Sequence, residues 1–271
     1  MKQTLITSEP VGLSGSLKKI WDYRALILTF AQRDLKVKYA QTILGIGWSI
    51  LQPLTALLIF AFFFGYILKW DAEGLPYSLY VLSGLLGWNF FSYIVYQGTA
   101  SIQESAMLIK KIYFPKAVLP FSKIYIALVE LVISFLLFIP LLLWHQQIVS
   151  WKIVFIPLVL FFNTLAALFL VFISTALAYR KRDILHVVPF LMYFGIWVTP
   201  VFFTKQTLSG TLQLIWYLNP MAAVTEAWRW CLFPQWEFDL YFLPGLLVLI
   251  PLFLFGFWLF IKNERKFSDY I

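Results

Sequence analysis

Long apolar segments separated by short charged connections dominate this sequence. Six segments stay apolar for about 20 residues, the length of helix that crosses a hydrocarbon core about 30 Å thick. The pattern therefore predicts an all-α integral membrane protein with six transmembrane helices. The predicted spans cover residues 42–68, 79–99, 118–144, 153–179, 185–203 and 240–261.

The basic residues lie mostly on one side of these predicted spans. All but four of the 21 Lys and Arg residues fall in the N-terminal segment, in or beside the second and fourth connections, or at the C-terminus. By the positive-inside rule, both termini and the even-numbered connections are cytoplasmic. We expect a cytoplasmic N-terminus over residues 1–41, a transmembrane domain over 42–261 and a cytoplasmic C-terminus over 262–271. The four exceptions are Lys69, Lys152, Lys205 and Arg229.

The composition agrees with a chain surrounded by lipid. Of the 271 residues, 61% are hydrophobic and 13% are charged, against roughly half and a quarter in an ordinary globular domain. The net charge of +8 lies in clusters between apolar runs, which suits an anionic membrane surface rather than nucleic acid. The single cysteine, the two histidines and the absence of P-loop, H-E-x-x-H and G-x-S-x-G motifs argue against catalysis. We expect no catalytic residues, no metal site and no cofactor in this chain.

The segment ahead of the first span mixes apolar and basic residues over positions 21–41. This pattern predicts an amphipathic helix that lies in the membrane interface. A solvated linker helix is the alternative. The characteristic residues of the interface helix are Trp21, Arg24, Arg33, Asp34, Lys36, Lys38 and Tyr39.

The second connection, residues 104–116, places three lysines among apolar residues on the predicted cytoplasmic side. Pro115 ends any helix there, because proline has no backbone N–H to donate. Two interpretations stay open: a basic loop that only sets the topology, or a short helix presented to a cytoplasmic partner.

The last outward connection, residues 204–239, contains two short apolar stretches over 212–218 and 222–232, separated by Asn219 and Pro220. Apolar runs of about 10–14 residues are more often re-entrant or interfacial than spanning. The sequence predicts two short re-entrant helices in the outer half of the membrane; a hairpin lying flat on the outer leaflet is the alternative. Glu226 and Arg229, three residues apart, are positioned to pair.

Few polar residues lie inside the predicted spans. Glu130 is the one acidic residue deep in a span, and we expect it to form an interhelical hydrogen bond or a pair with Lys123 rather than a proton relay. Pro53 favours a kink in the first span. Gly84 and Gly87 would let neighbouring helices approach the second span closely.

Several stretches then occur in a characteristic order. They are 33–39 (RDLKVKY), 41–45 (QTILG), Trp48 with 51–53 (LQP), 87–91 (GWNFF), 108–115 (LIKKIYFP), 182–184 (RDI), and 218–221 (LNPM) with Glu226 and Ala227. As an ordered set they resemble the membrane subunit of ABC polysaccharide exporters, in the ABC type-2 transporter family. The resemblance extends from residue 21 to residue 271, and the N-terminal layout is most similar to the O-antigen branch.

This resemblance implies a homodimeric permease of the bacterial inner membrane that exports undecaprenyl-diphosphate-linked polysaccharide, O-antigen above all. Two copies of a separate ATPase subunit would bind ATP and Mg²⁺. The first and fifth spans would line the dimer interface and a channel, with gate helices between residues 207 and 234. The implied coupling helix comprises Glu104, Met107, Leu108, Ile109, Lys110, Lys111, Tyr113 and Phe114. The channel or gate candidates are Phe60, Phe63, Tyr66, Trp88, Phe91, Trp197, Trp216, Tyr217 and Glu226.

Other functions stay open beside this one. Within the same family, the cargo could be teichoic acid or capsule, or a drug or lipid. From a different class, the chain could be a membrane-embedded transferase acting on lipid-linked sugars. A transferase needs paired acidic or histidine residues near the membrane surface, and the sequence presents none.

Overall fold

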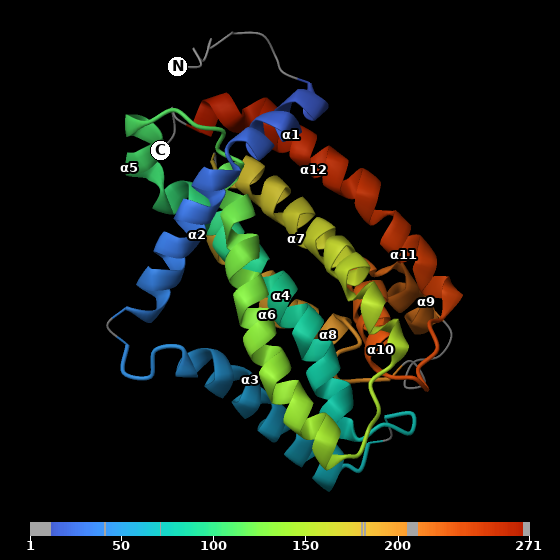
Figure 1. Cartoon of the computed structure of the whole chain (residues 1–271). Helices are drawn as coiled ribbons and strands as arrows, with labels where there is room; N and C mark the ends of the chain where they lie inside the picture. The colour runs from blue at the N-terminus through green and yellow to red at the C-terminus, as the bar shows by residue number, and fades with distance from the viewer. Residues whose placement is uncertain are drawn as a thin grey trace.

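The computed structural model describes residues 12–40, 42–70, 72–179, 181, 183–204 and 211–267. Within these ranges the chain is helical and contains no β-strand (Figure 1). The all-α prediction is therefore confirmed for the part of the chain that the structure describes. The elements are α1 (Leu13–Asp22), α2 (Arg24–Tyr39), α3 (Gly47–Phe60), η1 (Ala61–Ile67), α4 (Tyr77–Glu104), α5 (Ala106–Lys111), α6 (Val118–Trp144), η2 (Trp151–Phe155), α7 (Ile156–Ala178), α8 (Ile184–Val198), α9 (Thr211–Leu218), α10 (Pro220–Leu232), η4 (Leu240–Phe242), α11 (Leu243–Leu247), α12 (Leu249–Asn263) and η5 (Glu264–Lys266).

Five helical segments are long and apolar enough to cross a membrane. The third predicted span matches its helix, α6, at both ends, whereas α4 begins two residues before and ends five residues after the predicted 79–99. Pro53 lies inside α3, and the change from α- to π-helix comes later, at Ala61. The five segments are Gly47–Ile67, Tyr77–Glu104, Val118–Trp144, Trp151–Ala178 and Leu240–Asn263.

The predicted fifth span is shorter than the sequence pattern suggested. We expected it over 185–203, but α8 ends at Val198 after 15 residues. The cause is local: Thr199 precedes Pro200 and has an extended backbone with ψ 141°, since a proline disfavours helical geometry in the residue before it. A 15-residue helix is about 22 Å long, less than the roughly 30 Å of a bilayer core. The sixth crossing therefore stays a prediction.

Helix α4 forms the centre of the bundle. The most apolar part of Tyr77–Glu104 is 78% buried, against 11% for Gly47–Ile67, and α4 packs against α3, α6, α7, α8 and α10. The prediction that Gly84 and Gly87 permit close packing is confirmed for α4 against α10. A Cβ atom on Gly87 would lie 2.6 Å from Cδ1 of Trp228, and one on Gly84 would lie 3.0 Å from Nη2 of Arg229. Asn163 of α7 donates a hydrogen bond of 3.0 Å to the Gly87 carbonyl.

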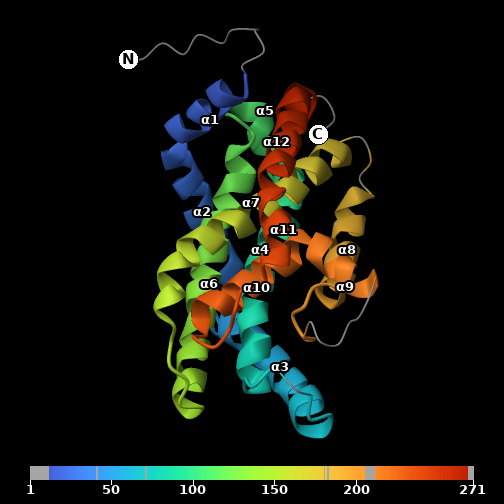
Figure 2. The same ribbon diagram turned by 90° about the vertical axis from the view of Figure 1, so that its right-hand side faces the viewer.

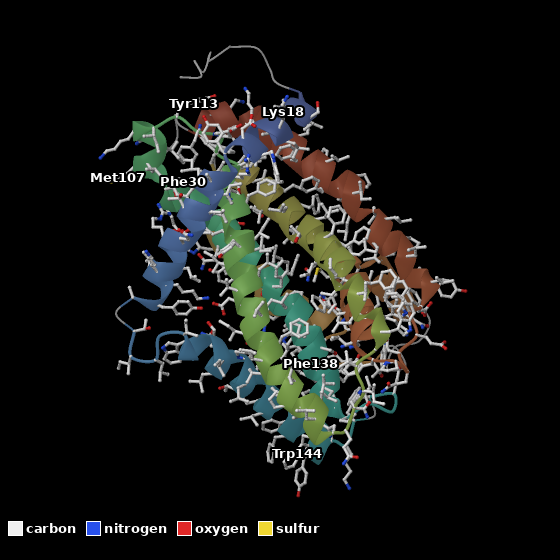
Figure 3. All side chains as sticks on the ribbon, viewed as in Figure 1. Lys18, Phe30, Met107, Tyr113, Phe138 and Trp144 are labelled. Carbon is white, nitrogen blue, oxygen red and sulfur yellow. The ribbon has the colours of Figure 1, made fainter. Side chains whose placement is uncertain are left out.

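The two ends of the bundle differ in character. Helices α1 and α5 and the C-terminal end of α12 gather at one end, and α3 extends away toward the other (Figures 1 and 2). Lys18, Met107 and Tyr113 lie at the first end, and Trp144 lies at the opposite end (Figure 3). The side-chain Nζ of Lys116 donates a 2.6 Å hydrogen bond to the carbonyl of Glu264, which ties the connection after α5 to the end of α12.

Candidate functional site

The connection between α4 and α6 forms a projecting helix with one anchored and one free face. Helix α5 begins after Ser105 and ends where Ile112 becomes extended. Its free face carries Met107, whose exposed fraction is 80%, and Ile112 and Tyr113, which follow the helix, are also exposed. Exposed apolar side chains on a projecting helix are typical of a protein-binding surface.

The predicted coupling residues divide between these two faces. Ile109 and Phe114 are buried and fix the connection to the bundle, with the Phe114 and Phe30 ring centroids 5.5 Å apart. Leu108 is partly buried against the core. Glu104 is the last residue of α4 rather than a part of α5. The exposed members are Glu104, Met107, Lys110, Lys111 and Tyr113.

The predicted interface helix is two helices rather than one. Trp21 belongs to α1, which ends at Asp22, and α2 begins at Arg24 after the single non-helical residue Tyr23. Lys36 and Arg33 lie toward the surface, while Phe30 and Ala31 are buried where α2 packs against α6. The position of these helices in the membrane interface remains a prediction.

A chain of charged groups joins α2, α4 and α6 beneath the projecting helix. Lys123 of α6 has its Nζ 2.7 Å from Oδ2 of Asp34 and 3.9 Å from Oε2 of Glu104, the last residue before α5 leaves the bundle. The Lys123 side chain is only 6% exposed. Asp34 also pairs with Arg33 at 2.6 Å. The buried Lys123 ammonium thus connects α2 to the end of α4, where the connection that contains α5 begins.

The prediction that Glu130 pairs with Lys123 is wrong. The two residues are seven apart on one helix, which separates them by about 10 Å along the axis. Helix α2 crosses α6 instead, so Glu130 receives a 2.6 Å contact from Nζ of Lys38 and a hydrogen bond from Tyr39. The interhelical hydrogen bond that we expected for Glu130 is therefore confirmed, and its donors are Lys38 and Tyr39 of α2.

Tyr39 belongs to a second polar cluster, which also contains Lys38, Ser49 and Glu130. Its hydroxyl lies 2.7 Å from that of Ser49 in α3 as well as contacting Glu130 of α6. Burial, followed by the hydrogen bond to Glu130, raises the pKa of Tyr39 to about 12. Tyr39 therefore stays protonated at physiological pH and acts as a hydrogen-bond donor linking the end of α2 to two spanning helices.

An aromatic face lies on α3, η1 and the end of α8. The Phe60 and Phe202 rings stack with centroids 3.8 Å apart, and Trp197 lies 6.0 Å from Phe60. Phe63 and Tyr66 are exposed, and so is Trp197. Of the predicted channel set, Phe63, Tyr66 and Trp197 are the residues that present aromatic rings at the surface of a single chain.

The remaining channel and gate candidates are buried, except Tyr217, which is partly buried. Trp88 and Phe91 are buried in α4 with ring centroids 5.4 Å apart. Trp216 is buried, and Tyr217 donates a 2.9 Å hydrogen bond to Asp239. Glu226 is also buried. In the chain as described, Trp88, Phe91, Trp216 and Glu226 are buried within the protein, and Tyr217 is partly buried.

The predicted Glu226–Arg229 pair is present and deeply buried. Nη1 of Arg229 is 2.6 Å from Oε1 of Glu226, with side-chain exposures of 0% and 4%. Nη2 of Arg229 donates to the carbonyl of Val201 at 3.1 Å, and its guanidinium lies 3.6 Å from the Tyr80 ring centroid. Nε1 of Trp236 donates to the second oxygen of Glu226 at 2.9 Å. Helix α10 is thus an internal helix, which the alternative of a flat surface hairpin does not fit.

Most of the chain matches the model of one known protein family. The family model described as ABC-2 type transporter matches residues 25–233, from the start of α2 to the end of α10. The chain belongs to this family. The match includes the projecting helix, the polar clusters beneath it, the aromatic face and the buried pair of α10.

Several relatives of this transporter share one name. An O-antigen export system permease protein RfbA from Myxococcus xanthus is 29% identical over 79% of this chain and 82% of its own length. Two proteins of the same name from Klebsiella pneumoniae are 23% and 24% identical, each over 75% of this chain and 78% of their own.

Sequence analysis of the transporter missed the partners that complete its polar clusters. Ser49, Tyr80, Tyr93 and Trp236 carried no predicted role, yet each contacts a charged or polar group: the Lys38 ammonium, for example, lies 4.6 Å from the Tyr93 ring centroid. The available signal was the polar end of each tyrosine and tryptophan, which normally finds a partner when buried. Which partner it finds depends on how the helices cross, and no spacing in the sequence gives that.

We predict that Lys123→Met lowers the stability of the transporter by about 1.5–3 kcal/mol, the range for hydrogen bonds to charged groups. The substitution leaves Asp34 partly buried without its ammonium partner. Arg33→Met is the matched control, because it removes the exposed partner of the same carboxylate and should cost about 0–1 kcal/mol. Thermal unfolding of both variants in one detergent checks this; equal losses would show that Lys123 is not the central contact.

Proposed function

We propose that this chain is the membrane subunit of an ATP-driven exporter of polysaccharide linked to undecaprenyl diphosphate, with O-antigen as the cargo. The single observation that carries the proposal is membership of the ABC-2 type transporter family together with three relatives named O-antigen export permeases. A glycan cannot cross hydrocarbon unaided, since each unpaired polar group costs several kcal/mol there. Export therefore requires a protein path and an energy source.

The energy source in this proposal is a separate ATPase subunit, bound in two copies, that holds ATP and Mg²⁺. Two features support a docking role for α5. It exposes the apolar Met107, and Tyr113 is exposed just after its end. Its base is joined to α2 and α6 through Lys123. Movement of a bound ATPase would be transmitted to the spanning helices through the buried anchors Ile109 and Phe114.

We further propose that the chain works as a homodimer with both termini in the cytoplasm. Helix α3 with η1 is the least buried of the spanning segments, and its partly buried Phe60 ring lies 6.0 Å from that of Trp197 in α8. A second copy placed against this aromatic face would bury it and enclose a path whose flat rings suit sugar surfaces. The basic end that carries Lys18, Lys110 and Lys111 then faces the cytoplasm of the bacterial cell.

The two short helices α9 and α10 are proposed as the outer gate. They follow the predicted fifth span and precede the last one. Their contacts join the helices around them: Asn219, which caps α10 by accepting from the Met221 N–H at 2.9 Å, also donates to Thr199 at 3.4 Å just beyond α8. A movement of α8 would therefore be transmitted through Thr199 and Asn219 to the gate helices.

Disruption of this chain in its source bacterium tests the proposal. We expect surface O-antigen to disappear and polysaccharide linked to undecaprenyl diphosphate to accumulate inside the cell, as measured by gel analysis of surface lipopolysaccharide and by fractionation of lipid-linked glycans. Accumulation of teichoic acid or capsule precursors instead would reassign the cargo within the family. Unchanged surface polysaccharide with no accumulated precursor would contradict export altogether, and loss of a sugar-modified lipid with no accumulated polymer would favour a transferase.

A further inference from the structure

A cavity of about 500 Å³ lies between the start of the fourth spanning segment, α10 and the start of the last spanning segment. This volume falls in the range of about 300–1,000 Å³ that is typical of small-molecule sites. The walls are apolar side chains from several elements. They include Phe155, Leu158, Phe162, Trp230, Phe238 and Leu246.

The cavity reaches the lipid-facing surface of the protein. Leu158 and Leu240, which line it, are exposed. Phe155 stands between two tryptophans, with ring centroids 6.1 Å from Trp151 and 5.4 Å from Trp230. Tryptophans of spanning helices are enriched at the level of the lipid head groups. The mouth of the cavity is therefore expected at the boundary between head groups and hydrocarbon.

Two charged residues of opposite sign line the same cavity. Nζ of Lys152 donates to the carbonyls of Trp236 at 3.0 Å and Pro234 at 3.3 Å, and it lies 5.4 Å from the Trp230 ring centroid. An ammonium has three N–H donors, so one remains for an anionic ligand. Glu237, which is exposed, supplies a carboxylate to the same lining.

We propose that this cavity binds one phospholipid with a zwitterionic head group of the phosphoethanolamine type. One acyl chain occupies the apolar cavity, the phosphate accepts from Lys152, and the ammonium of the head group lies near Glu237. The site is separate from the coupling helix and from the aromatic face proposed as the dimer contact.

The charges at the mouth decide which lipid is retained. Lipid tails are as apolar as the cavity walls, so a tail gains little free energy by leaving the bilayer for the cavity. A charge-assisted hydrogen bond from Lys152 to phosphate is the strong interaction available. A phosphatidylglycerol head group satisfies Lys152 but offers the carboxylate of Glu237 only neutral hydroxyl donors, whereas phosphatidylethanolamine offers it an ammonium and a charge-assisted hydrogen bond.

Binding would also hold α10 in place. Ala227 and Trp230 of α10 line one side of the cavity, and Phe155 and Leu158 line the other. An acyl chain in the cavity would contact both α10 and the fourth spanning segment, beside the place where Trp230 and Phe155 already pack together. We therefore expect bound lipid to raise the thermal stability of the purified protein.

Native mass spectrometry of the delipidated full chain tests this proposal. With equal amounts of phosphatidylethanolamine and phosphatidylglycerol, the unaltered protein should retain phosphatidylethanolamine, and Lys152→Met should retain it at least tenfold more weakly. Glu237→Gln should lose the preference between the two lipids. Lys262→Met is the matched control, because that lysine also lies over a tryptophan ring, at 4.8 Å from Trp258, but does not line the cavity.

Leu158→Trp provides a second test that does not depend on the contacts of Lys152 with the backbone. The larger side chain at the exposed mouth should block phosphatidylethanolamine while the melting temperature without lipid stays unchanged. Equal retention by the unaltered protein, Lys152→Met and Leu158→Trp would overturn the proposal. So would preferential retention of phosphatidylglycerol by the unaltered protein. The measurement needs neither ATP nor transport, so its failure leaves the proposed export function untouched.

Discussion

Replacing Met107 by Asp is expected to abolish co-purification of this permease with its ATPase and to stop export. Met107 is 80% exposed at the free face of a six-residue helix that projects from the bundle. The few side chains that dominate a protein interface each cost about 2 kcal/mol or more when truncated. A carboxylate forced into such a contact adds the cost of burying a charge without a partner. We expect the affinity for the ATPase to fall well over tenfold, as measured by pull-down and by the ATPase activity of the reconstituted complex.

Ile148→Asp is the matched control for this substitution. Ile148 is 77% exposed and lies in the loop four residues after Trp144, which is at the opposite end of the bundle (Figure 3). It tests whether any acidic substitution of an exposed apolar side chain has the same effect. Both variants should keep the melting temperature of the unaltered protein. Full ATPase binding and full export by Met107→Asp would show that α5 is not the coupling helix.

Replacing Arg229 by Met is expected to destabilise the permease by about 3–5 kcal/mol, the usual cost of removing one partner of a buried ion pair. The substitution leaves the buried carboxylate of Glu226 dependent on the Trp236 indole, which donates to it at 2.9 Å. It also leaves the Val201 carbonyl without its 3.1 Å hydrogen bond from Nη2. Thermal or denaturant unfolding of the purified protein in one detergent measures the loss.

The double variant Glu226→Gln with Arg229→Met separates the charge from the packing. The amide oxygen introduced at position 226 would still accept from the Trp236 indole, so the double variant should recover a large part of the lost stability. Arg24→Met, which removes an exposed arginine lying 5.5 Å from the Trp21 ring centroid, should change stability by less than about 1 kcal/mol. A loss for Arg229→Met no larger than that of Arg24→Met would contradict the assignment of a central role to this pair.

The spanning helices were largely predictable because long apolar runs and their charged ends are local features of the sequence. Val118–Trp144 begins and ends where the apolar run does. The early end of α8 also has a local cause, Pro200. The apolar run continues past this proline to Phe203, and for that reason the sequence pattern predicted a longer helix. The projecting α5 was one of two interpretations of its connection, and Pro115 marked where it had to stop.

The pairings between elements could not be read from spacing. Glu130 and Lys123 share a helix, yet each takes its partner from α2, because the crossing of α2 over α6 brings Lys38 and Asp34 to different turns. The burial of α10 could not be predicted for the same reason. The spacing of Glu226 and Arg229 predicted that they pair. Their burial, however, depends on residues that approach them only in the folded bundle, namely Gly84, Gly87 and Tyr80 of α4 and Trp236.

The most direct test of the export function is transport in proteoliposomes that contain this chain, its ATPase and a labelled polysaccharide linked to undecaprenyl diphosphate. We predict that the glycan crosses the bilayer only when ATP and Mg²⁺ are present and that Met107→Asp abolishes this transfer. Transfer without ATP would contradict the account. So would a complex that hydrolyses ATP and moves small hydrophobic compounds but leaves the glycan where it was loaded.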